Sequence, residues 1–165
     1  MGFSLMTEGA LRAGLPDTSW RPLVAKFGYS AGFVLVILGR QQLFTENTLT
    51  PVLPLLHKRD KPTLRSVLRL WTVVLLANLV GALAVAIVLG NTPVFSPEVR
   101  QAFTDLGRES LAPGFGLMLL RGIFAGWLMA LMVWLLPVAE VARVWVILII
   151  TYLVGLSHSS HIIVG

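Results

Sequence analysis

Long apolar stretches constrain this chain more than any other feature of its sequence. Three of them occupy residues 23–38, 70–89 and 115–136, and a fourth begins at Val144. A helix needs about 20 mainly apolar residues to cross the hydrocarbon core of a bilayer, and a lipid-exposed backbone must satisfy its own hydrogen bonds. We therefore predict an all-α, multi-pass membrane protein with about four to five spans, in which residues 1–165 form one transmembrane domain.

The composition excludes other classes of protein. Hydrophobic residues make up 56% of the chain and charged residues 13%, against about 45–50% and about 25% in soluble domains. The net charge of +5 is explained by membrane topology rather than by a nucleic-acid partner. The chain has no cysteine and three histidines, so we expect neither a metal nor another cofactor. No plausible nucleophile and base come together, so we predict no enzyme.

The charged loops predict the orientation of the chain. Residues 57–69 hold five basic side chains and one acid, whereas residues 91–114 hold two basic side chains and three acids. Because cytoplasmic loops carry an excess of Lys and Arg, 57–69 and 137–143 are predicted to be cytoplasmic, and 15–21 and 91–114 external. The external loop is expected to carry a short amphipathic helix near 98–106.

Residues 2–15 look like the end of a further helix. Glu8 and Arg12 are four residues apart and are expected to pair on one face of it, and Pro16 ends it. The spacings Gly28-xxx-Gly32 and Gly122-xxx-Gly126 permit close helix approach or are ordinary membrane-helix glycines.

A polar stretch at 39–48 interrupts the first apolar run, and residues 49–56 turn apolar again, with Pro51 and Pro54 among them. This pattern predicts a helix that is broken at membrane depth, which is tolerated inside protein or along a wet cavity. Arg40 and Glu46 are expensive in hydrocarbon. Their side chains either attract anions and gate the transport path, or form a structural ion pair that stabilises the broken helix.

The C-terminal run repeats this pattern. Residues 144–156 are apolar, 157–161 are polar, and 162–164 are apolar. The predicted topology gives the two interrupted spans opposite directions, as an inverted repeat requires. Paired interruptions of this kind indicate a transport site.

Four segments carry a resemblance to a known family. They are LFTENT at 43–48, ANLVGA at 77–82, AGWLMALMVW at 125–134 and HIIVG at 161–165. In order and spacing the chain resembles the formate/nitrite transporter family and looks closest to its YfdC-type bacterial branch. The resemblance implies an aquaporin-like helical bundle that forms a homo-pentamer in the bacterial inner membrane and passes small monovalent anions such as formate or nitrite. Most of the first helix and the sixth helix of such a protomer have no counterpart, so we expect a chain truncated at both ends.

The resemblance also implies roles for individual residues. His161 matches the central pore histidine, and Leu43, Phe44 and Thr45 match the loop at the break. Phe33, Tyr29 and Val154 match apolar constriction positions. The structural or gating positions are Arg40, Glu46, Asn47 and Asn78, of which Asn78 is expected to bond the broken backbone of a neighbouring segment. A lysine of the family has no counterpart here, and Glu109 and Ser110 lie near its place. Arg40 or Arg121 would then supply the positive charge of that lysine. Gly126 replaces a family asparagine.

The predicted mechanism uses His161 as a proton donor. An anion loses hydration in an apolar constriction at a large free-energy cost, whereas a neutral acid does not. The ordinary pKa of His, about 6.5, suits this transfer. Alternatives are a buried structural His161, His158 as the pore residue under a shifted match, and a His158–His161 metal pair, which lacks a third ligand. The competing function is a membrane scaffold that keeps the fold without transport.

Overall fold

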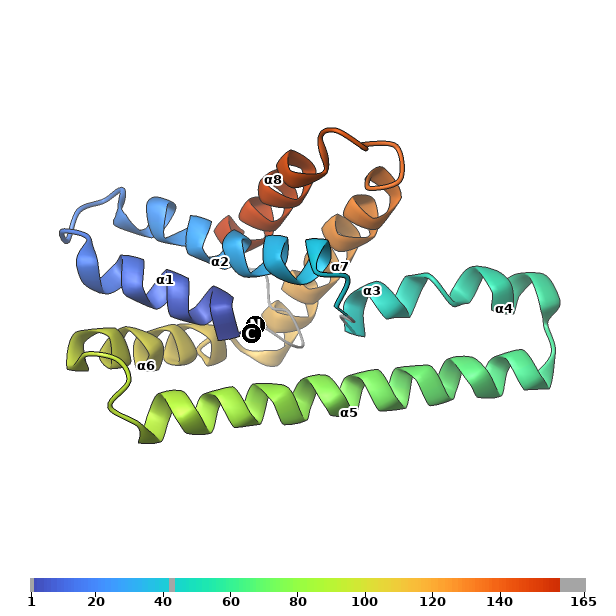
Figure 1. The fold of residues 1–165 in the computed structure, drawn as a ribbon, viewed down its shortest axis with the longest axis horizontal. Coiled ribbons are helices and arrows are strands. Elements are labelled where there is room, and N and C mark those ends of the chain that lie inside the picture. The colour runs from blue at the N-terminus through green and yellow to red at the C-terminus, as the bar shows by residue number, and fades with distance from the viewer. Residues whose placement is uncertain (1, 42–43, 158–165) are drawn as a thin grey trace.

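The computed structural model describes residues 2–41 and 44–157, and these ranges form eight α-helices and no strand (Figure 1). In chain order the helices are α1 (Gly2–Gly14), α2 (Arg21–Leu38), α3 (Phe44–Leu49), α4 (Val52–Lys58), α5 (Lys61–Asn91), α6 (Pro97–Leu111), α7 (Phe115–Leu135) and α8 (Arg143–Leu156). By length and composition α2, α5 and α7 are able to cross a membrane, and α8 is a shorter apolar helix. The predicted all-α membrane class is confirmed.

The helices divide between the two ends of α5. At one end α6 returns along α1, and α1 packs against α2; at the other, α3 and α4 run back along α5 (Figure 1). The pair α7–α8 contacts both groups, because α8 packs on α2 and α7 on α3. The short amphipathic helix expected near 98–106 is α6, and α1 ends at Gly14, just before Pro16.

An acidic side chain caps the long helix α5. Asp60 Oδ1 accepts a hydrogen bond from Thr63 N at 2.8 Å, which satisfies one of the free N–H groups at the helix start. Because hydrogen bonds from the Thr63 side chain and from Thr63 N favour the carboxylate, the pKa of Asp60 lies below its ordinary value. The helix therefore begins inside the basic segment that the sequence predicts to be cytoplasmic.

The first predicted break is present. Helix α2 ends at Leu38, where Gly39 N still donates to Leu35 O at 2.9 Å, and Arg40 turns into the left-handed region with φ of 51°. A new helix, α3, begins at Phe44. The second break, expected at 157–161, lies outside the described residues except for Ser157, which directly follows the end of α8.

A buried cluster joins α2, α7 and α8 into one core. Its members are Tyr29, Phe33, Ala125, Met129, Met132, Ile147, Ile150 and Val154. By contrast, only Val67, Val74 and Leu89 are buried in the 31 residues of α5. Exposed apolar side chains on that scale mark a surface that meets lipid or other protein.

Two glycines let α1 lie directly on α2. A Cβ atom at Gly28 would stand 2.7 Å from Glu8 Cα, and one at Gly32 would stand 2.6 Å from Ser4 N. The contact is reinforced by Ser4 Oγ, which donates to Tyr29 O at 2.9 Å. The close approach at Gly28-xxx-Gly32 is therefore present, whereas a Cβ at Gly126 would meet open space among the described residues.

Candidate functional site

The fold brings three of the predicted constriction residues together. Tyr29 and Phe33 follow one another by one turn on α2, with ring centroids 5.0 Å apart. Val154 on α8 belongs to the same buried cluster, and each of the three is at most 8% exposed. Val154 thus shares one apolar contact region between α2 and α8 with two residues that lie 121 and 125 positions before it in the sequence.

Helix α3, which follows the break, is hydrogen-bonded to α5. Phe44 N, the first amide of α3, donates to Asn78 Oδ1 at 3.2 Å. This amide has no partner within its own helix, since the first four N–H groups of a helix never do. Asn78 therefore makes the contact to a broken backbone that the sequence predicts for it.

A second side chain on α5 holds the same helix. Trp71 Nε1 donates to the carbonyl oxygen of Asn47 at 2.8 Å, and Asn47 itself is buried. Trp71 and Asn78 are two helical turns apart, so they lie on one face of α5. No local sequence pattern around Trp71 predicts this hydrogen bond, because the acceptor lies 24 positions away.

Replacing Asn78 with leucine is expected to loosen α3. The substitution leaves the Phe44 amide without its acceptor, which costs about 1–3 kcal/mol for a buried group. Amide hydrogen exchange over 44–49 in detergent-purified protein should quicken accordingly. Asn91→Leu, at the exposed far end of α5 where the side chain donates to Ile87 O in its own helix, serves as the control. Equal exchange over 44–49 in the two variants would show that Asn78 does not hold α3.

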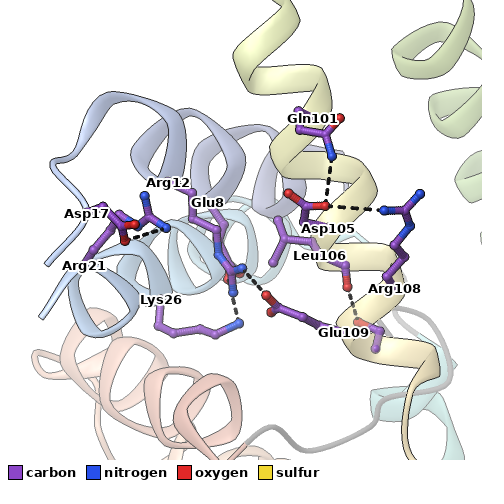
Figure 2. Close-up of polar contacts among 11 residues, drawn as sticks. Glu8, Arg12, Asp17, Arg21, Lys26, Gln101, Asp105, Leu106, Arg108 and Glu109 are labelled. Atoms are coloured by element: carbon purple, nitrogen blue, oxygen red, sulfur yellow. Dashed lines mark hydrogen bonds and ion pairs between the residues drawn. The ribbon is translucent and has the colours of Figure 1, made fainter. Parts of the chain in front are cut away.

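A network of four charged side chains joins α1, α2 and α6 (Figure 2). Glu8 Oε1 accepts from Lys26 Nζ at 2.6 Å and from Arg12 Nη2 at 3.3 Å, and Arg12 Nη1 donates to Glu109 Oε1 at 2.9 Å. The predicted Glu8–Arg12 pair is confirmed. Lys26 and Glu109 were not predicted to belong to this network. The lysine within the apolar run 23–38 is nevertheless a signal of a partner, because an unpaired charge is costly there.

Burial distinguishes the members of this network. The side chains of Glu8, Lys26 and Arg12 are 5%, 13% and 15% exposed, whereas that of Glu109 is 52% exposed. Lys26 also reaches the core, since its Cδ and the ring of Tyr29 both lie 3.3 Å from where a Cβ of Gly155 would stand. The charged network therefore borders the apolar contact region of Tyr29, Phe33 and Val154.

Comparison with known proteins places this chain in a family. The family model described as formate/nitrite transporter matches residues 1–165. The chain belongs to the formate/nitrite transporter family. This confirms the resemblance drawn from the four sequence segments, and it makes the protein a membrane-embedded member of a family of helical transporters.

The curated relatives agree with this family. The chain is 39% identical over 165 residues to inner membrane protein YfdC of Escherichia coli (strain K12), over all of this chain and 53% of YfdC. It is 28% identical over 118 residues to the uncharacterized transporter YwcJ of Bacillus subtilis (strain 168), over 71% of this chain and 45% of YwcJ. It is 28% identical over 150 residues to the formate channel BtFdhC of Bacillus thuringiensis, over 86% of this chain and 57% of BtFdhC.

Two further findings concern the extent of these matches. The chain spans about half the length of the curated relatives it matches. No solved structure gives a significant match.

Several of the positions matched to the formate/nitrite transporter family lie outside the described residues. These are Leu43, His158 and His161, and the side chains of Thr45 and Glu46 are likewise not described. The Arg40 side chain is exposed. Because the side chain of Glu46 is not described, the Arg40–Glu46 ion pair stays a prediction. Across residues 2–41 and 44–157, no three His, Cys, Asp or Glu side chains gather as a metal site would need.

Proposed function

We propose that this protein carries small monovalent anions, such as formate or nitrite, across the bacterial inner membrane, as a single-domain protomer of a homo-pentamer. The match to the formate/nitrite transporter family over residues 1–165 supports the transport class, and the relative named formate channel supports the substrate class. The structural observation that carries the proposal is the interruption between α2 and α3. Unwound backbone at membrane depth is tolerated where protein or a water-filled path surrounds it.

The constriction would select for a neutral permeant. Tyr29, Phe33 and Val154 offer an apolar surface, and an ionised carboxylate that leaves water for such a surface pays a large desolvation free energy. We propose that His161 donates a proton to the anion, which then crosses as the weak acid. A histidine suits this step because its ordinary pKa, about 6.5, lies near physiological pH.

The test is anion uptake by the protein in liposomes. Formate or nitrite uptake should exceed that of protein-free liposomes, and an inward proton gradient should increase it. The alternative, a membrane scaffold that keeps the fold, predicts uptake equal to that of protein-free liposomes under every gradient. Uptake that is the same with and without the proton gradient would refute the proton-linked mechanism but not the transport of the anion.

A further inference from the structure

The charged network beside the candidate constriction offers a site for an anion. We propose that the Lys26 ammonium binds the permeating anion at the end of the conduit that the topology places outside, and that Glu8 is the counter-ion the anion displaces. This inference rests on the proposed function and adds a binding residue and its regulation to it.

The first support is the position of Lys26. It stands one turn before Tyr29 on α2, and its aliphatic stem packs beside Gly155 of α8. The candidate constriction lies directly below it along α2, because Tyr29 and Phe33 follow at the next two turns. Arg40, considered above as the source of positive charge, is 14 residues further along the chain, about 20 Å away for a helix that rises 1.5 Å per residue.

The second support is the difference between the two cations of the network. The Arg12 guanidinium is held between two carboxylates, Glu8 and Glu109. Within the described part of the chain, the ion-pair partner of Lys26 is Glu8. An ammonium has three donor hydrogens, so a second acceptor can bind Lys26 while its stem stays in place.

The third support is the buried hydroxyl of Tyr29, whose ring shares the contact with Gly155 that the stem of this lysine makes. The Tyr29 side chain is 8% exposed, and its hydroxyl has no hydrogen-bond partner among residues 2–41 and 44–157. Buried polar atoms in native proteins nearly always have a partner, so an unpartnered one calls for an explanation. A small anion with two acceptor oxygens, such as a carboxylate, is able to accept from both Lys26 and Tyr29.

The charge balance explains why Glu8 belongs to the site. With two cations and two carboxylates, the network is neutral as it stands. A neutral network avoids holding an uncompensated charge when no anion is bound. An arriving anion competes with Glu8 for Lys26, so the binding is reversible and the anion is able to leave again.

Transport kinetics of charge variants test the proposal. Lys26→Gln leaves the network with a net negative charge, and the half-saturating concentration for formate uptake should rise about tenfold, in keeping with one unit charge at close range. Lys26→Arg should keep most of the wild-type affinity. Glu8→Gln should lower the half-saturating concentration, because Lys26 then has no competing carboxylate. The matched control is Arg21→Gln, which removes a positive charge from the same helix, where Arg21 pairs with the exposed Asp17 at 3.1 Å.

A double variant separates binding from a purely structural clamp. Glu8→Gln/Lys26→Gln is as neutral as the wild type, so a clamp that needs only charge balance would regain wild-type uptake. An anion site at Lys26 predicts that the double variant keeps the raised half-saturating concentration. Wild-type uptake with an unchanged half-saturating concentration in both Lys26 variants and the double variant would overturn the inference.

A binding measurement keeps this inference separate from the proposed function. Sodium formate should raise the melting temperature of the detergent-purified wild type above its value in sodium gluconate of equal ionic strength, and Lys26→Gln should lose this shift. Absence of uptake in liposomes would refute the proposed function, whereas a formate shift that persists in Lys26→Gln would refute the site.

Discussion

Replacing Gly28 with leucine is expected to destabilise the protein strongly. The Cβ atom alone would stand 2.7 Å from Glu8 Cα, and this neighbour is backbone that cannot rotate away. Overpacking of a close contact costs about 1–3 kcal/mol even where side chains can adjust, so we expect a loss of at least about 3 kcal/mol here. The melting temperature of the detergent-purified protein, followed by size-exclusion chromatography, measures this loss.

The same substitution on another helix serves as the control. Gly126 lies on α7 in a similar small-residue spacing, but a Cβ there meets open space among the described residues. Gly126→Leu should therefore melt close to the wild type. If Gly28→Leu and Gly126→Leu lost equal stability, α1 would not be seated on α2 as described.

Replacing His161 with asparagine is expected to abolish proton-coupled uptake. Asparagine keeps polar atoms of similar size but has no ionisable proton to give. The anion would then have to cross the constriction in its charged form, whose desolvation is costly enough to slow transport by at least about a hundredfold. Formate uptake into liposomes, measured with and without an inward proton gradient, detects this loss.

The other two histidines provide controls for this prediction. His57 lies exposed on α4, so His57→Asn should leave both the rate and its pH dependence unchanged. His158→Asn tests the shifted match, under which the loss would follow His158 instead. Unchanged pH dependence in His161→Asn would reject the proton-donor role of His161.

Much of the fold was predictable because single stretches of sequence encode it. The apolar runs locate α2, α5 and α7, and the charged residues between these runs mark the connecting segments. The break after Leu38 is also local, since Gly39 and the polar residues that follow cannot continue an apolar helix at low cost. The helix α6 follows from its own amphipathic pattern.

The charged network was predictable only in part. Helical spacing reveals the pair Glu8–Arg12, because residues four apart share a face. Lys26 and Glu109 lie 18 and 97 positions from their partners Glu8 and Arg12, and no local pattern brings such distant charges together. The bond from Trp71 to the Asn47 carbonyl has the same origin, since it depends on how α3 is folded back onto α5.

The continuous length of α5 sets the depth of the break within the bilayer. Its 31 residues measure about 46 Å, whereas a hydrocarbon core is about 30 Å thick. If the apolar residues 70–89 fill that core, the basic start of the helix projects about 13 Å into the headgroups and water. Asn78 then lies about 12 Å inside the hydrocarbon and holds the first amide of α3 at that level. A thinner membrane that tilts α5 would therefore move the break with it.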